Sequence, residues 1–252
     1  MIVLEAGINH FGKLNEANKL LSFFLKSNFK YLTFMIQTDE FYKKNKKKIN
    51  FELPLAFYNK ALRQAKKKNK YIGLSVCDPE TYNKYLNIKF DFYKLLGIAI
   101  NNKELISKLR VKKKNIYISL AKGNDKKIDN CIKYFRDKKF LRFIYTNMSY
   151  DPNDLFLKRI QYLKKKYKIS TGYGHHYNNE IPIYISKVLG SEFLFIYIKN
   201  FHKKRIFYPD DTHAFFTKDL HILEKNLKTL DILLSNRKKI NTKIKINEKI
   251  KF

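Results

Sequence analysis

The chain has no tryptophan and only two cysteines, five prolines and eight glycines among its 252 residues. The cysteines, Cys77 and Cys131, lack the close spacing of zinc ligands, and two cysteines are too few for a disulfide framework. No apolar run approaches the roughly 18 residues of a membrane span, because the apolar opening of the chain meets an acid at Glu5. We therefore expect no membrane segment and no signal peptide, and we expect a cytoplasmic protein.

Acidic residues are also scarce, with 22 against 53 basic ones, which gives a net charge of +31. Such a charge raises the question of a nucleic-acid partner. However, only 7 of the basic residues are arginine, which reads phosphates and bases better than lysine does. The lysine triplets at 66–68, 112–114 and 164–166 each fall where a helix is expected to end, and there they complement the helix dipole. We therefore do not expect nucleic acid as a partner.

What the sequence has throughout is an alternation of strand-like and helix-like segments. Ala17, Leu20 and Phe24, for example, fall on one face of a predicted helix. The expected strands are residues 2–8, 31–36, 71–76, 92–98, 115–120, 141–146, 168–173 and 193–198. The expected helices are residues 14–25, 54–67, a short one opened by Asp78-Pro79-Glu80, one from about 102, and then 126–135, 153–166, 181–189 and 218–234.

Eight strand–helix units in about 250 residues predict a single-domain α/β fold, a (β/α)₈ TIM barrel over residues 1–235. A doubly wound open sheet is the alternative, but it usually has fewer strands, and no glycine-rich phosphate fingerprint follows the first strand. Residues 236–252 alternate lysine with isoleucine, and we expect a frayed basic tail or a short edge strand there.

Polar side chains gather at the predicted carboxyl ends of the strands, where barrels carry their functional residues. The set contains four of the six histidines. It comprises Glu5, Asn9, His10, Gln37, Thr38, Cys77, Asp78, Lys94, Ser119, Lys122, Thr146, Asn147, Tyr173, His175, His176, Asp210, Asp211 and His213. Glu5 is an acid inside an apolar strand, which is costly unless it has a partner or a function. Lys94 is either that partner, across the barrel, or a holder of an anionic ligand, and both interpretations can apply together.

Residues 5–12, EAGINHFG, closely resemble the E-I-G-x-N-H-x-G opening of the sialic acid synthase (NeuB) family. Further motifs of that family are matched in chain order over roughly residues 2–225. They are Gln37-Thr38, Tyr93-Lys94, Ile118-Ser119, Thr146-Asn147, the segment Gly172-Tyr173-Gly174-His175-His176, Gly190-Ser191 and Pro209-Asp210-Asp211.

The resemblance implies a carbon–carbon bond forming transferase of surface carbohydrate biosynthesis. Family members condense phosphoenolpyruvate with N-acetylmannosamine or a related amino sugar to a nonulosonic, sialic-type acid. It further implies a divalent metal, Mn²⁺ or Mg²⁺, that polarises the sugar aldehyde, and it is compatible with a homodimer. The resemblance assigns catalysis to Glu5, Asn9 and His10, and the binding of phosphoenolpyruvate to Lys94 and Ser119. It implies that His176 is a metal ligand. The other substrate-binding residues that it implies are Gln37, Asn147, Tyr173, Asp210 and Asp211.

The sequence departs from the family at several positions of the expected site. Met35 replaces a lysine, and Tyr197 replaces the second metal histidine. Gly97 and Ala99 replace a serine and an acid. We also expect no C-terminal antifreeze-like domain. Two hypotheses follow: a working synthase, or a catalytically weakened barrel that serves as a sugar-binding or assembly protein.

Overall fold

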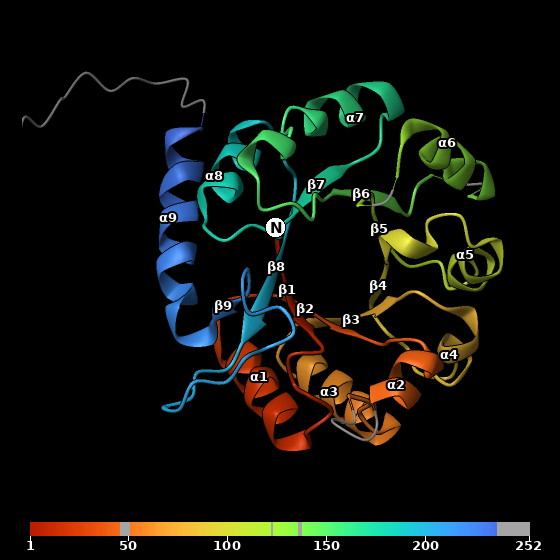
Figure 1. The fold of residues 1–252 in the computed structure, drawn as a ribbon, viewed down its shortest axis with the longest axis vertical. Helices are drawn as coiled ribbons and strands as arrows, with labels where there is room; N and C mark the ends of the chain where they lie inside the picture. The colour runs from red at the N-terminus through yellow and green to blue at the C-terminus, as the bar shows by residue number, and fades with distance from the viewer. Residues whose placement is uncertain (46–50, 122, 136–137, 236–252) are drawn as a thin grey trace, which may run out of the picture.

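The computed structural model describes residues 1–45, 51–121, 123–135 and 138–235. In this part of the chain, eight parallel strands pair in chain order, and the first also pairs with the eighth. The strands are β1 (Ile2–Gly7), β2 (Tyr31–Met35), β3 (Tyr71–Val76), β4 (Phe92–Leu95), β5 (Ile116–Ser119), β6 (Leu141–Tyr145), β7 (Thr171–Gly174) and β8 (Leu194–Lys199). The sheet is therefore closed into the predicted (β/α)₈ barrel, with its helices arranged around it (Figure 1).

The helices of the described residues follow the strands in turn. They are α1 (Leu14–Lys26), α2 (Asp39–Asn45), α3 (Leu55–Lys66), α4 (Pro79–Asn83), α5 (Lys103–Arg110), α6 (Asp125–Tyr134), α7 (Arg159–Tyr167), α8 (Ile181–Val188) and α9 (Leu220–Leu233). Short 3₁₀ turns η1 (Gly97–Ala99), η2 (Pro152–Asp154) and η3 (Thr217–Asp219) and a two-residue strand β9 (Phe215–Phe216) complete the elements. The predicted tail, residues 236–252, and Lys122 lie outside the described residues.

Three predicted boundaries were wrong for local reasons. The fourth strand ends at Leu95, because the chain turns into η1. The helix expected over 153–166 is divided into η2 and α7, since Phe156 has a φ of +39° that no helix accommodates. The seventh strand begins at Thr171, because Lys168 ends α7 in the left-handed region. The helix α2 was not predicted.

The core has two layers, one inside the barrel and one between the barrel and the helices. The interior layer is rich in aromatic side chains, including Phe92, Phe193 and Phe195. Phe92 occupies the space where a side chain at Gly73 of the neighbouring strand would lie, 2.3 Å from the nearest ring carbon. Glycine at this inward position lets a large ring fill the barrel axis.

The end of α1 is fixed by a lysine from the start of β3. Lys70 Nζ donates to the carbonyl oxygens of Phe24 and Ser27 at 2.6 Å and of Phe29 at 2.8 Å. These carbonyls lie at or beyond the carboxyl end of α1, where no later turn of the helix supplies donors. One buried ammonium therefore satisfies the turn that leads from α1 into β2.

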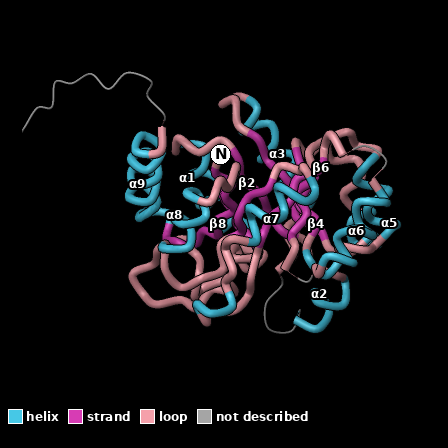
Figure 2. The backbone as a smooth tube through the Cα atoms, turned by 90° about the horizontal axis from the view of Figure 1, so that it is seen from above, coloured by secondary structure: helices cyan, strands magenta, loops and turns pink. Residues whose placement is uncertain are grey.

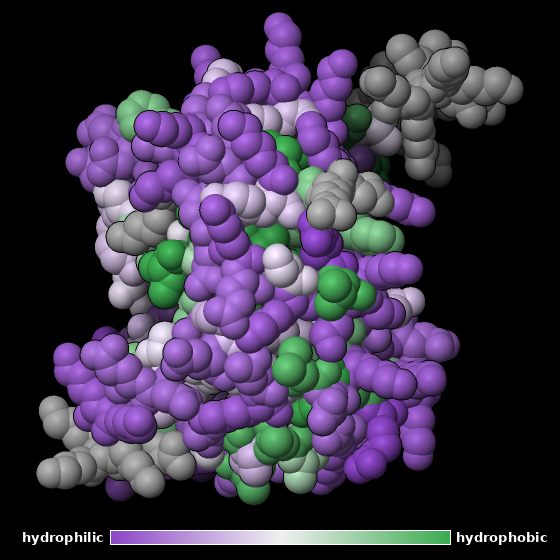
Figure 3. Space-filling view, turned by 90° about the vertical axis from the view of Figure 1, so that its right-hand side faces the viewer, coloured by the Kyte–Doolittle hydropathy of each residue, from purple (hydrophilic) through white to green (hydrophobic). Residues whose placement is uncertain are grey.

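The long loops lie at one end of the barrel, on the side away from the N-terminus (Figure 2). This is the end where the parallel strands finish, and barrels carry their functional loops there. The outer face over α5 and α6 is mostly hydrophilic, with small scattered hydrophobic groups (Figure 3). None of the helices in the described ranges combines the length and the hydrophobicity needed to cross a bilayer.

Candidate active site

A buried ion pair lies at the centre of the barrel. Lys94 Nζ, from β4, is 2.5 Å from Glu5 Oε2, from β1, and the two side chains are 2% and 1% exposed. The pairing of these residues across the barrel, predicted from the sequence, is therefore confirmed. Burial raises the pKa of Glu5, and the positive charge of Lys94 opposes that rise.

Tyr197 of β8 lies beside this pair. It is in register with Glu5 across the strand pair that closes the barrel, and its ring centroid lies 5.5 Å from Lys94 Nζ. Burial, together with the negative charges of Glu5 and Asp210, raises the pKa of Tyr197 well above its ordinary value. Tyr197 is therefore a neutral phenol that fills the space next to the ion pair.

Asp210 approaches the same centre from the loop after β8. A side-chain carbon at position 7 would lie 2.8 Å from both Asp210 Oδ2 and a ring carbon of Tyr197, and Gly7 has a φ of +52°. Gly7 also lies at a register shift in the pairing of β1 with β2. Glycine is thus required there both by conformation and by the close approach of two side chains. Burial, reinforced by the Glu5 charge and opposed by Lys94, raises the pKa of Asp210 to about 7.

Two histidines extend the cluster towards the loops. The rings of His176, after β7, and His213, after β8, have centroids 4.6 Å apart. His213 Nε2 lies 3.7 Å from Asp210 Oδ1. Burial lowers the pKa of His213 to about 4 and that of His176 well below its ordinary value. Both imidazoles are consequently neutral near pH 7.

The second metal ligand of the family pattern has no counterpart at its own position, which is Tyr197. Among the described residues, no three histidine, cysteine, aspartate or glutamate side chains are placed so that they could hold a metal ion. Tyr197, at the position of the second family histidine, packs its ring 5.2 Å from that of His176. A phenol with a raised pKa is a poor ligand for a divalent metal at neutral pH.

The other residues of the first-strand motif hold the backbone around the cluster. Asn9 Nδ2 donates to Ile198 O at 3.0 Å, and the Asp210 backbone N–H donates to Asn9 Oδ1 at 3.2 Å. Asn9 therefore fixes the loop that carries Asp210. His10 Nδ1 accepts from Gly12 N at 2.9 Å, and burial lowers the pKa of His10 to about 3.

Three further predicted residues, Ser119, Gln37 and Asp211, have contacts of their own around the barrel mouth. Ser119 is buried at the end of β5, two residues after Tyr117 of the interior layer, so that it faces inward. Gln37 Nε2 lies 3.1 Å from Met35 Sδ at the mouth of the barrel. Asp211 Oδ1 accepts from Lys199 Nζ at 2.8 Å.

Three predicted residues have contacts away from the ion pair. Tyr173 belongs to the layer between the barrel and the helices, and His175 packs on it with ring centroids 6.0 Å apart. His175 and His176 thus have different surroundings, as expected of adjacent residues. Asn147 Nδ2 lies 2.5 Å from Asp154 O and organises the loop after β6.

A hydrophobic cluster covers the mouth above the ion pair. Met35 and Tyr197, two departures from the family pattern, pack with Ile8, Tyr42 and Phe51. The other two departures, Gly97 and Ala99, lie in η1. Where the family pattern has a lysine and a metal-binding histidine, this chain therefore has the apolar contacts of Met35 and Tyr197.

One polar pair of the barrel interior was missed. The hydroxyls of Thr33 and Ser75 lie 3.1 Å apart and are buried, and Ser75 is in register with Lys94. Their signal is the alternation of side chains along a strand, since Thr33 lies two residues before Met35 and Ser75 lies two residues before Cys77.

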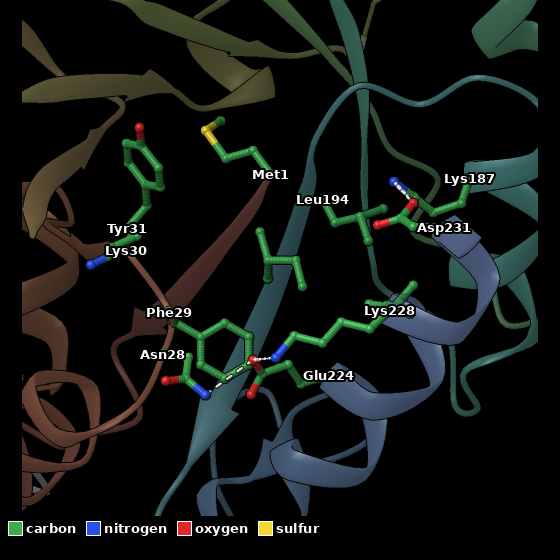
Figure 4. A pocket seen from close by; sticks show the side chains of 12 residues that line it. Met1, Asn28, Phe29, Lys30, Tyr31, Lys187, Leu194, Glu224, Lys228 and Asp231 are labelled. Carbon is green, nitrogen blue, oxygen red and sulfur yellow. Dashed lines mark hydrogen bonds and ion pairs between the residues drawn. The ribbon is translucent and has the colours of Figure 1, made fainter. Parts of the chain in front are cut away.

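A separate cavity of about 330 Å³ lies at the opposite end of the barrel (Figure 4). Its walls include Phe29, Leu194 and the ion pair of Lys187 with Asp231. In barrels the end where the strands begin contributes stability, whereas chemistry takes place where they end. The candidate active site is therefore the cluster around Glu5 and Lys94.

Comparison with solved structures supports the fold. N-acetylneuraminic acid (sialic acid) synthetase from Leptospira borgpetersenii serovar Hardjo-bovis, in complex with citrate, is 20% identical with a TM-score of 0.82, and the match covers 96% of this chain and 87% of that one. Spore coat polysaccharide biosynthesis protein spsE from Bacillus subtilis is 18% identical with a TM-score of 0.79, covering 93% of this chain and 68% of that one. A putative spore coat polysaccharide biosynthesis protein E from Chromobacterium violaceum is 14% identical with a TM-score of 0.81, covering 95% and 77%.

No curated protein sequence gives a significant match. The family description NeuB, in contrast, matches residues 21–239, which is most of the chain and extends from α1 through the last helix. The order of motifs, the closed barrel and this match agree, and the chain belongs to the NeuB family.

Proposed function

We propose that this protein is a sugar-acid synthase of carbohydrate biosynthesis that condenses phosphoenolpyruvate with an N-acetylated amino sugar to a sialic-type acid. The observation that carries the proposal is the buried pair of Glu5 and Lys94, 2.5 Å apart in the barrel of a NeuB family member. A buried lysine at this position supplies the charge that a carboxylate or phosphate needs.

The proposed reaction uses Lys94 as the anion holder and Glu5 as the acid/base. Phosphoenolpyruvate displaces Glu5 from Lys94, and the Ser119 hydroxyl donates a hydrogen bond to the phosphate. The enol carbon attacks the sugar aldehyde, water adds to the resulting cation, and phosphate leaves by C–O cleavage. Glu5, whose pKa is raised by burial, accepts one proton from the attacking water and passes it to the alkoxide that the aldehyde oxygen has become, while the second proton of the water leaves with phosphate.

The metal, the homodimer and the cytoplasmic location stay predictions from the sequence. His176 is the family position for a metal ligand, although no three histidine, cysteine, aspartate or glutamate side chains of the described residues form a site for a metal ion.

The second candidate function is sugar binding without turnover. It is favoured by the apolar cover over the mouth, where Met35 and Tyr197 belong to one hydrophobic cluster in place of the family's lysine and metal histidine. A barrel that lost contacts to phosphate would bind phosphoenolpyruvate more weakly, by about tenfold for each 1.4 kcal/mol of binding free energy that is lost.

Phosphate release tests the proposal directly. The protein is incubated with phosphoenolpyruvate, Mn²⁺ and a panel of N-acetylated amino sugars, and we expect release only when both substrates are present. Glu5→Gln is expected to lower the rate by about 10²–10⁴, the usual contribution of general acid–base catalysis.

The matched control removes an ion pair from the surface. Lys108 and Glu104 lie 2.6 Å apart on α5, so that Glu104→Gln makes the same chemical change outside the barrel. The control should retain full activity. No release with any sugar, together with intact sugar binding, would overturn the synthase proposal in favour of the second candidate. Circular dichroism verifies that each variant is folded.

A further inference from the structure

A second pocket, of about 590 Å³, lies on the loop that follows β8. The loop projects outward from the barrel next to α1 and β9 (Figure 1). The volume is in the range of sites that hold a small molecule. Because Asp211 lines this pocket and Asp210 faces Gly7 at the barrel centre, the pocket lies beside the candidate active site.

The charge of the pocket is strongly positive. Lys203, Lys204 and Arg205 line it in succession and are all exposed. Of the described residues that line the pocket, Asp211 is the only carboxylate. Its Oδ1 and backbone oxygen accept from Lys199 Nζ at 2.8 and 2.6 Å, so its charge is already paired. An anion entering the pocket would therefore meet cations that no carboxylate of the lining neutralises.

Aromatic rings lie against one of these exposed cations, Arg205, and against the paired Lys199. Lys199 Nζ lies 4.5 Å from the centroid of Phe216, and the Arg205 guanidinium lies 4.7 Å from that of Phe207. Long cationic side chains usually lose much freedom when a ligand orders them, and contact with a ring reduces that loss in advance. The contact of Arg205 with Phe207 therefore reduces the cost of ordering this one side chain around an anion.

The two ends of the loop are anchored to the barrel. Asn200 Nδ2 and His202 Nε2 lie 2.8 and 2.9 Å from Glu16 Oε2 on α1. Tyr208 Oη donates to Asn200 O at 2.8 Å and closes the base of the loop. The exposed cations are consequently presented from a fixed base.

We propose that this pocket binds the phosphate group of a small molecule. Adjacent cations suit a phosphate, which offers several acceptor oxygens and more than one negative charge. The phosphate could be carried by a sugar or by a nucleotide, and the binding measurement separates these sources. The proposal does not depend on the synthase reaction.

Calorimetry with inorganic pyrophosphate tests the proposal. The triple variant Lys203→Gln, Lys204→Gln, Arg205→Gln should bind at least tenfold more weakly than the unchanged protein. The matched control is Lys66→Gln, Lys67→Gln, Lys68→Gln, which removes the same charge from exposed positions at the end of α3, where the strands begin. The control should bind within about twofold of the unchanged protein. Absence of binding by the unchanged protein, or equal weakening in both variants, would overturn the proposal.

Two further titrations identify the source of the phosphate. One compares a hexosamine 6-phosphate with the free hexosamine, and the other compares a nucleoside diphosphate with its nucleoside. If the phosphorylated compound of one comparison binds more tightly than its unphosphorylated counterpart, and the triple variant loses this difference, that compound identifies the class of ligand. If neither phosphate improves binding, the proposal is overturned. Pyrophosphate binding without phosphate release in the activity assay would remove only the proposed function.

Discussion

At the scale of single residues, the centre of the barrel contains two carboxyl groups and one lysine. Glu5 and Asp210 both interact with Lys94, which forms its ion pair with Glu5. Asp210 Oδ2 is buried and has no hydrogen-bond partner among the described residues. Because two nearby carboxylates repel each other when both are ionised, Asp210 is the group that keeps its proton to higher pH.

This surplus acid makes stability depend on pH. The pKa of Asp210 rises from 3.8 to about 7 on folding, so the folded state holds the proton more tightly than the unfolded state between these values. Asp210 therefore lowers the free energy of unfolding as pH rises through this window, by up to about 1.4 kcal/mol per pH unit. Asp210→Asn should remove this loss, so that the variant gains stability relative to the unchanged protein between pH 5 and 8.

Urea denaturation at several pH values measures the difference between the two proteins. Asp219→Asn, at a partly exposed position of the turn η3, is the control and should show no such gain. A constant difference between the unchanged protein and Asp210→Asn across the range would contradict the prediction.

The sequence predicted the central pair but not its surroundings. Glu5 and Lys94 were identifiable because each is a charge inside an apolar strand. The position of Tyr197 above them depends on the pairing of β1 with β8, which brings together residues nearly 200 positions apart. Tyr173 was expected at the site, yet it faces the helices, because side chains alternate along β7 and its neighbour Gly172 takes the inward position against Phe193.

At the scale of elements, the end of α1 depends on a residue of another element. Lys70→Met should leave the carbonyls of Phe24, Ser27 and Phe29 without their donor. We expect a loss of about 1–3 kcal/mol in the free energy of unfolding, the usual cost of unsatisfied buried polar groups. Lys68→Met, at an exposed position two residues earlier, is the control. Equal stability of the two variants in urea would show that the cap contributes nothing.

Element types were predictable and element ends were not. The alternation of apolar segments predicted every strand of the barrel. The ends depend on single backbone conformations, such as the positive φ of Phe156 and Lys168, which neither residue type favours. Lys70 likewise carries no local signal, since its function depends on the packing of α1 beside β3.

At the scale of the whole molecule, a net charge of +31 acts against compactness. Raising the ionic strength from 0.01 to 0.1 M shortens the screening length from about 30 to about 10 Å. We expect the melting temperature to rise by several degrees over this range, since each kcal/mol corresponds to about 2–4 °C for a domain of this size. Scanning calorimetry measures the shift, with sucrose at matched osmolality as the control. A fall in melting temperature with salt would mean that surface ion pairs outweigh the repulsion.

The architecture itself followed from the order of segments and the length of the chain. Eight strand–helix units leave few arrangements other than the barrel, because parallel strands joined by helices wind in one hand. The chemistry of the site is less determined, since it depends on which polar side chains converge after the sheet has closed.

The closure between β1 and β8 also has a consequence for how the molecule is made. The backbone N–H of Leu194 donates to the carbonyl of Met1 at 2.9 Å, so the first strand to be synthesised finds its second neighbour only after nearly 200 residues. Contacts between such distant residues slow folding, because a long loop must be closed before they contribute. Until then one edge of β1 has no strand beside it, and an unpaired edge can bind a strand of another chain. The nascent barrel therefore keeps an edge that can aggregate until β8 has been synthesised and paired with β1.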